Sequence, residues 1–159
     1  MSKLTHLDDE GRARMVDVSD KVATAREALA RGTVTLAGGA FEAVRNGAAK
    51  KGDVLAVAQI AGVQAAKRTA ELIPLCHPLP LTHIDVICDL DAENEAVVVT
   101  ATAKTTGPTG VEMEALTAAS VACLTIYDMT KSYAKGHVIG PIRLLEKRGG
   151  KSGEWRSGD

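Results

Sequence analysis

The stretch from Gly110 to Lys131, GVEMEALTAASVACLTIYDMTK, constrains the fold of this chain more than any other. The thirteen residues 115–127 carry no charge, while carboxylates and a lysine flank them. A membrane span needs about 20 apolar residues, so this shorter stretch, which contains Ser and Thr, predicts a helix buried on more than one side. Ionisable groups beside a buried helix lose hydration and need compensating partners. Both ends of this helix therefore suggest a functional site.

Length and net charge limit the number of domains and the kinds of partner to expect. The chain has 159 residues, which fits a single domain. Its net charge of -1 gives no reason to expect nucleic acid or an anionic membrane as a partner. We expect one domain over residues 1–159, with about 1–15 and 150–159 flexible because they are polar and terminal.

The apolar content is made mostly of small side chains, with one Phe, one Trp and two Tyr. Such side chains give a thin core, so we predict that contacts between subunits complete the burial. Three cysteines, an odd number without metal-ligand spacing, make a disulfide framework or a metal site improbable. The first residues contain no apolar segment of signal-peptide length. A cytoplasmic protein is the expectation.

The order of secondary structure predicts an α+β fold. Residues 54–72 have helical spacing, with Asp53 as the N-cap. Residues 84–90 and 96–103 are β-branched runs that predict a hairpin. Residues 137–145 predict a last strand after the long helix. With an early strand at 33–36, this is the ferredoxin-like split βαβ arrangement, an antiparallel sheet with helices on one face. Residues 21–31 have helical propensity, and only the tertiary pattern favours an extended segment there.

The two ends of the long helix carry different candidates. Asp128 and Lys131 are three residues apart and share a face; they can be catalytic or a structural ion pair. Glu114 and Asp128 are separated by roughly 21 Å of helix, so they cannot both touch one small reacting centre on one chain. If both belong to an active site, either the substrate is long or a second copy of the helix closes the site. Glu112 can be a pocket residue or the last member of a capping box that starts at Thr109.

Two further segments contain candidate functional residues. Lys51 lies before a helix N-terminus, where a phosphate is favoured, although a solvated lysine in a turn is the simpler interpretation. His77 lies in a proline-rich loop that could hold its imidazole ready for proton transfer. The sequence GGKSG near the C-terminus is not a P-loop, since the preceding glycine and the following helix are missing, but its basic residues can clamp a phosphate.

Several phrases together resemble one family. KKGDV at 50–54, AGVQAAKRTAELIPLCHPL at 61–79, TGPTGVEMEALTAASVACLTIYDMTK at 106–131 and IGPIRLLEK with GGKSG at 139–153 are similar to the molybdenum cofactor biosynthesis protein C family, the cyclic pyranopterin monophosphate synthases. The resemblance implies a ferredoxin-like lyase that assembles as a homohexamer, a trimer of dimers, with active sites between subunits. It implies no cofactor and no membrane.

The resemblance also implies the reaction and its residues. A radical GTP cyclase acts upstream and makes 3′,8-cyclo-7,8-dihydro-GTP, which the family rearranges to cyclic pyranopterin monophosphate with release of pyrophosphate. Asp128, Lys51 and Lys131 match the family's catalytic residues. The positions that match substrate-contacting residues are Leu75, Cys76, His77, Met113 and Glu114, followed by Glu112, Lys67, Lys147, Asp17, Lys21 and Arg26. Clustered cations are expected to lower a lysine pKa, so that Lys51 or Lys131 can transfer protons.

Two other classes of protein compete with the enzyme hypothesis. A ferredoxin-like RNA-binding module needs aromatic side chains on its sheet, and the predicted strands at 84–90 and 96–103 contain none. A purely structural assembly protein would use the charged helix ends only for pairing between subunits. Under that hypothesis, changing Asp128 would abolish assembly, whereas under the enzyme hypothesis it would abolish activity alone.

Overall fold

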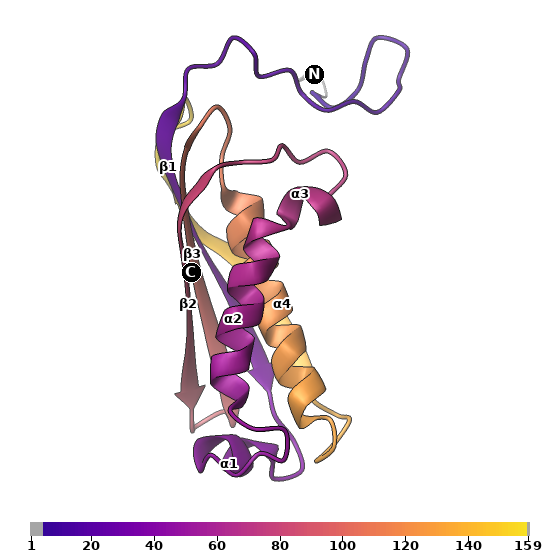
Figure 1. The fold of residues 1–159 in the computed structure, drawn as a ribbon, viewed down its shortest axis with the longest axis vertical. Helices are drawn as coiled ribbons and strands as arrows, with labels where there is room; N and C mark the ends of the chain where they lie inside the picture. The colour runs from indigo at the N-terminus through magenta and orange to yellow at the C-terminus, as the bar shows by residue number, and fades with distance from the viewer. Residues whose placement is uncertain (1–4, 159) are drawn as a thin grey trace.

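A computed structural model describes residues 5–158 and shows one antiparallel sheet covered by helices on one face (Figure 1). The elements are β1 Thr24–Thr35, α1 Ala40–Arg45, α2 Val54–Lys67, α3 Thr69–Leu72, β2 Leu81–Asp91, β3 Ala96–Gly107, α4 Glu112–Thr130, β4 Val138–Arg148 and β5 Trp155–Arg156. The strand order is β2-β3-β1-β4-β5. Its first four strands have the ferredoxin-like order, so the predicted fold class is confirmed.

The first strand is longer than predicted. It begins at Thr24 and pairs with β3 along its whole length and with β4 on its other side. Alternate residues, including Ala28, Ala30 and Val34, are buried against the helices. The helical propensity of residues 21–31 is therefore overridden by pairing on both edges and by the buried face.

The long helices α2 and α4 lie side by side over the sheet (Figure 1). The Asp53 carboxylate accepts from the Ala56 amide at 3.0 Å, which confirms the predicted N-cap of α2. The helix ends at Lys67 instead of Leu72, because the Thr69 hydroxyl donates back to the Ala66 carbonyl at 2.9 Å and competes with helix continuation. A one-turn helix, α3, follows.

The core is built from small side chains, as the composition indicates. Ala115, Ala118, Ala119 and Ala122 of α4 are fully buried, together with the larger Ile126. No helix of the described chain is long and apolar enough to cross a membrane. At the C-terminus, β5 pairs with β4 through Trp155 and Arg156. The flexibility expected for the two ends stays a prediction; residues 1–4 and 159 lie outside the described residues.

Candidate active site

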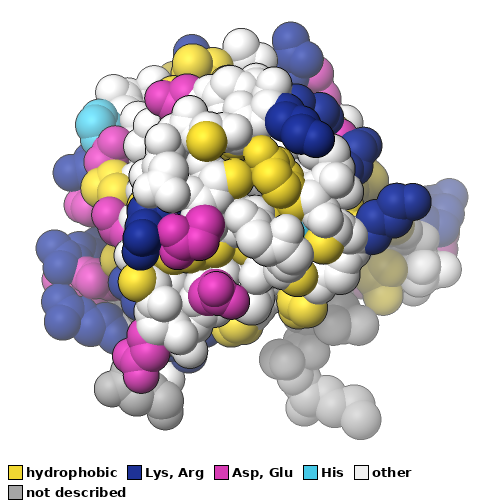
Figure 2. Space-filling model, turned by 90° about the horizontal axis from the view of Figure 1, so that it is seen from below, with side chains coloured by type: hydrophobic (Ala, Val, Ile, Leu, Met, Phe, Trp, Pro, Cys, Tyr) yellow, Lys and Arg dark blue, Asp and Glu magenta, His cyan; other side chains and the backbone are white. Residues whose placement is uncertain are grey.

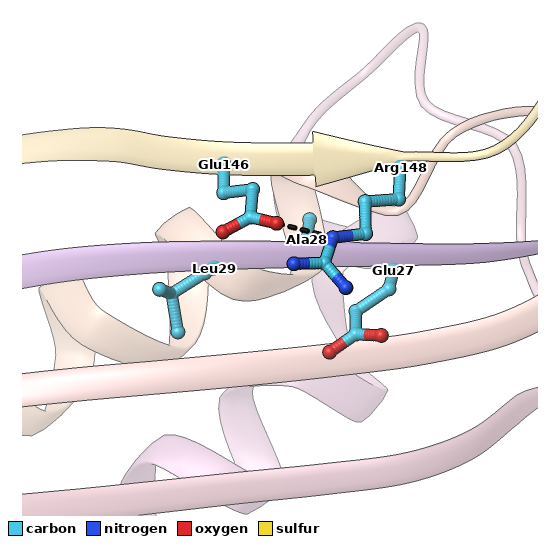
Figure 3. A pocket seen from close by; sticks show the side chains of 5 residues that line it. All are labelled: Glu27, Ala28, Leu29, Glu146 and Arg148. Atoms are coloured by element: carbon cyan, nitrogen blue, oxygen red, sulfur yellow. Dashed lines mark hydrogen bonds and ion pairs between the residues drawn. The ribbon is translucent and has the colours of Figure 1, made fainter. Parts of the chain in front are cut away.

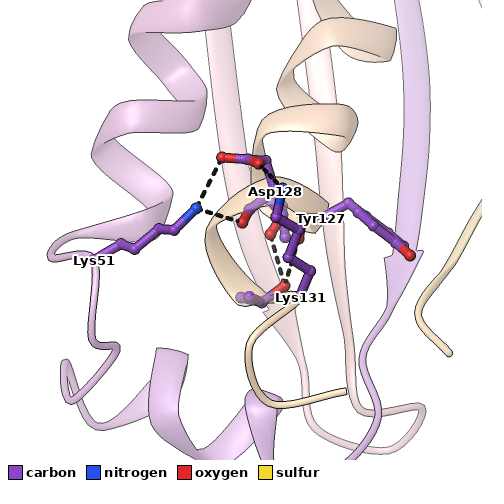
Figure 4. Close-up of polar contacts among 6 residues, drawn as sticks. Lys51, Tyr127, Asp128 and Lys131 are labelled. Atoms are coloured by element: carbon purple, nitrogen blue, oxygen red, sulfur yellow. Dashed lines mark hydrogen bonds and ion pairs between the residues drawn. The ribbon is translucent and has the colours of Figure 1, made fainter. Parts of the chain in front are cut away.

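Lys51, Asp128 and Lys131 form one cluster at the C-terminal end of α4 (Figure 4). Lys51 reaches across from the turn before α2. Its Nζ lies 3.1 Å from Asp128 Oδ2 and 2.9 Å from the Asp128 main-chain oxygen. Lys131 Nζ, one helical turn beyond Asp128, lies 2.6 Å from Oδ1. The structure thus brings the three predicted catalytic residues together, and all three side chains are about half exposed.

The carboxylate sets the electrostatics of this cluster. Hydrogen bonds from Lys131 and then Lys51, strengthened by their charges, lower the pKa of Asp128. The hydrogen bond to Asp128 and its charge in turn raise the pKa of Lys131. The expected lowering of a lysine pKa is therefore wrong for Lys131, because a carboxylate in direct contact favours the ammonium form. Lys131 is a cation in the free protomer.

A pocket of about 640 Å³ lies at the opposite end of α4. The proline-rich loop provides Leu75, Cys76 and His77, and the first turn of α4 provides Glu112 and Met113. The segment before β1 adds Val16 and Val18 to the lining, and it is held there because His77 Nε2 donates to the Val16 carbonyl at 2.6 Å. With Lys21, which also lines it, six predicted substrate-binding residues therefore share one cavity.

Burial shifts the pKa of two titratable groups at this end of α4, Cys76 and Glu114. It raises the pKa of the Cys76 thiol, and the charges of Glu114 and Glu112 add to this effect. A thiol held in its neutral form suits binding better than nucleophilic attack. Glu114 is only 2% exposed, its Oε2 has no hydrogen-bond partner within the described chain, and burial raises its pKa. Glu114 lies behind the pocket surface in the single protomer.

A second, more basic hollow of about 390 Å³ adjoins this pocket. Both contain Lys21, Thr109 and Gly110, while the second adds Arg26 and Lys151. The Arg26 guanidinium is fixed by the Gly107 carbonyl at 3.0 Å and the Pro108 carbonyl at 3.2 Å. Two adjoining cavities, one largely apolar and one basic, are suited to a ring system that carries phosphates.

The remaining predicted residues lie around the same end of the molecule. Lys147 of β4 forms a 2.6 Å ion pair with Glu112. Asp17 accepts from the Ser19 hydroxyl at 2.6 Å and from its amide at 2.9 Å, and these bonds lower the pKa of Asp17. Lys67 is exposed in the last turn of α2. Asp17 lies between Val16 and Val18, which line the larger pocket, and the last turn of α2 lies near the start of α4 (Figure 1). All three therefore belong to the pocket end, apart from the Asp128 cluster.

The capping-box interpretation of Glu112 is wrong. The N-cap of α4 is Val111, no side chain caps the helix, and Glu112 is the first helical residue. Its carboxylate instead reaches across to the cation on β4. Thr109, the expected cap, lines both hollows. His6 and Lys151 also line cavities; the sequence around His6 contained no signal for this, and Lys151 was visible only as part of a basic tail.

Another hollow lies on the sheet face away from the helices. Figure 3 shows Arg148 reaching back over β1 toward Glu146, with Glu27 on the other side of its guanidinium. This hollow measures about 60 Å³, which is too small for a nucleotide, and contains no predicted site residue. No group of three or more potential metal ligands occurs within residues 5–158.

Fold and site together define a ferredoxin-like α+β protein with a basic, two-chambered pocket and a separate lysine–aspartate–lysine cluster. Residues 15–150 match the MoaC family model. The chain is 59% identical over 157 residues to the cyclic pyranopterin monophosphate synthase of Cereibacter sphaeroides (strain KD131 / KCTC 12085), covering 99% of both chains. It is 56% identical over 158 residues to the enzyme of that name from Geobacillus thermodenitrificans (strain NG80-2), covering 98% of both. The chain belongs to the MoaC family, and the predicted resemblance is confirmed.

Proposed function

We propose that two copies of this chain build each active site, one giving the two-chambered pocket and the other giving Lys51, Asp128 and Lys131. The chain is an enzyme of molybdenum cofactor biosynthesis with the lyase activity of a cyclic pyranopterin monophosphate synthase. It converts 3′,8-cyclo-7,8-dihydro-GTP to cyclic pyranopterin monophosphate and releases pyrophosphate.

One observation carries the two-subunit site. The pocket and the lysine–aspartate–lysine cluster belong to opposite ends of α4, whose 19 residues span roughly 28 Å. A single substrate of nucleotide size cannot reach both groups on one protomer. If both act on it, they must come from different copies.

The chambers suggest how the substrate is oriented. The larger pocket, walled by Leu75, Met113 and the His77 loop, has a size typical of small-molecule sites and takes the fused rings. The basic hollow with Lys21 and Arg26 takes the phosphates, since guanidinium and ammonium groups are strong phosphate donors. Lys147 and Lys67 add positive charge at the same end.

The partner's cluster then supplies charge and protons. As cyclic phosphate closes and pyrophosphate leaves, negative charge grows on the phosphoryl oxygens, and ammonium groups stabilise it. Lys131 remains protonated because Asp128 raises its pKa, which suits it to donate a proton or neutralise an oxyanion. Asp128 fixes both amines through its two carboxylate oxygens.

Exposed apolar side chains support assembly. Val57 and Ile60 of α2 and Leu124 of α4 are 42%, 60% and 59% exposed, although large apolar side chains are usually buried. Figure 2, viewed from the α1 end, shows hydrophobic side chains among charged ones at the surface. We assign the homohexamer, a trimer of dimers, to such contacts. Free thiols fit a cytoplasmic location, where a radical GTP cyclase supplies the substrate.

Subunit mixing tests the proposal. His77→Ala and Lys131→Ala proteins, each inactive alone, are unfolded together, refolded and assayed for pyrophosphate release. With random assembly about a quarter of the sites combine an intact pocket with an intact cluster, so activity should return to about that fraction. Mixing Lys51→Ala with Lys131→Ala is the matched control, because both changes damage the same cluster and no mixed site is complete. Equal recovery in both mixtures, or none in either despite proven subunit exchange, contradicts the two-subunit site.

A further inference from the structure

His137 is a buried histidine just before β4 with one satisfied and one unsatisfied ring nitrogen. It is 7% exposed, and its Nδ1 accepts a hydrogen bond from the Ala37 amide at 3.1 Å. An Nδ1 that accepts fixes the neutral ring with its proton on Nε2, and within residues 5–158 this Nε2 has no hydrogen-bond partner. An apolar side chain would avoid this unpaired donor. The bond to Ala37 is therefore the distinctive contribution of the histidine.

The bond joins two loops that are far apart in sequence. His137 ends the loop that follows α4, and Ala37 belongs to the turn between β1 and α1. The same two segments approach closely at Gly38, where an added Cβ would lie 2.7 Å from the Ala134 Cβ. Glycine is also required there by its φ of +63°. The two loops thus form one packed unit.

Tyrosines tie this unit to the lysine–aspartate–lysine cluster. Tyr127, next to Asp128, meets the His137 ring edge-on with centroids 5.5 Å apart and donates its hydroxyl to the Lys135 carbonyl at 2.8 Å. Tyr133 donates to the Ala48 carbonyl at 3.2 Å, three residues before Lys51. The loop after α4 therefore contacts both segments that carry the clustered lysines.

We propose that His137 is a positioning residue for catalysis: its bond to Ala37 holds the loop 131–137 so that Lys51, Asp128 and Lys131 keep their mutual geometry. The proposal rests on the proposed catalytic role of that cluster. Because the cluster faces a substrate bound mainly by another protomer, a loosened loop misplaces the reacting amines without emptying the pocket. The effect falls on kcat more than on KM.

Two substitutions separate the contacts of the ring. His137→Phe keeps an aromatic edge for Tyr127 but removes the acceptor for Ala37, while the Oδ1 of His137→Asn can replace Nδ1 as the acceptor and has no ring. We expect His137→Phe to lower kcat at least about tenfold with KM within about threefold, since misplacement by about 1 Å can cost about a hundredfold. His137→Asn should restore most of that loss. His83→Phe, on the exposed part of β2, controls for histidine replacement.

The outcomes distinguish this inference from the proposed function. If Lys131→Ala is inactive and His137→Phe turns over normally, the positioning role is wrong and the catalytic cluster stands. If Lys131→Ala is fully active, the proposed cluster itself fails. Should His137→Phe not fold, the ring tautomer decides: ¹⁵N spectra of histidine-labelled full-length protein near neutral pH should show a proton on Nε2 alone. A proton on Nδ1 excludes the Ala37 bond and overturns the proposal.

Discussion

Lys51 donates to Asp128 twice, once to the carboxylate and once to the main-chain oxygen. The second bond matters because the last carbonyls of a helix have no partner within the helix. A cation at this position also interacts favourably with the negative end of the helix dipole. Lys51 therefore contacts both the side chain and the backbone of Asp128, and these two contacts fix the position of its amine relative to α4 (Figure 4).

Removing either clustered lysine should abolish turnover without unfolding the protein. Both Lys51 and Lys131 are about half exposed, so Lys51→Ala and Lys131→Ala should leave the free energy of unfolding nearly unchanged. Loss of a proton donor or charge stabiliser should lower the rate of pyrophosphate release about 10²- to 10⁴-fold.

A lysine on the sheet, away from the cluster, is the control for this loss of activity. Lys104 of β3 forms a 3.5 Å ion pair with Glu27 and is similarly exposed, so Lys104→Ala should keep the activity. Wild-type rates in either cluster variant, with assembly verified by light scattering, would remove that lysine from the mechanism.

Glu112 should matter for substrate binding and little for helix stability. Because Glu112 does not cap α4 and instead pairs with Lys147, Glu112→Gln removes the charge from an ion pair whose side chains are only about a quarter exposed, at a cost of about 1–2 kcal/mol. Lys147 then loses its orientation beside the pocket, and KM should rise several-fold. Urea unfolding and steady-state kinetics measure the two effects. A loss of stability well above this range with unchanged KM would favour the structural interpretation.

The close approach of β1 to α4 makes Gly32 sensitive to size. A Cβ at Gly32 would lie 2.7 Å from Cys123 Sγ, and both positions are buried. Gly32→Ala should lower the free energy of unfolding by about 1–3 kcal/mol through overpacking. Adding Cys123→Ala removes the clashing sulfur and should recover part of this loss in a double-mutant cycle. Gly136→Ala, with open space around it, should be nearly neutral; strictly additive effects at Gly32 and Cys123 would refute the contact.

Local sequence predicted the elements where pattern and packing agree. The hairpin of β2 and β3 and the helix α4 follow from β-branched runs and from an uncharged stretch flanked by charges. The predicted bounds were wrong where other contacts decide them. The first strand begins at Thr24 because β3 and β4 pair with it, and α2 ends early because the Thr69 hydroxyl donates to the Ala66 carbonyl.

The candidate site, too, could be predicted only in part from the sequence. The rise of a helix was enough to predict that Glu114 and Asp128 cannot share one small centre on one chain. The twin bonds of Lys51 to Asp128 join residues 77 positions apart, and the bond between Ala37 and His137 spans 100 positions. Spacing and propensity do not contain such contacts, which is why His137 had no signal in the sequence.

The charge of Asp128 should control the titration of Lys131. The pKa of Asp128 lies below its usual value, so the ion pairs are complete above the ordinary carboxyl range and are lost only as pH falls through that lowered pKa. The pKa of Lys131 lies above its usual value, so its contribution is complete below the ordinary lysine range and is lost as pH rises through the raised pKa. In the wild-type protein, Lys131 should therefore stay protonated across the neutral and mildly alkaline pH range. Asp128→Asn removes the carboxylate and should move the Lys131 titration to lower pH, seen by NMR of ¹³C-labelled lysine, with Lys131→Ala identifying the signal. An unchanged titration in Asp128→Asn would show that the contact does not govern the amine.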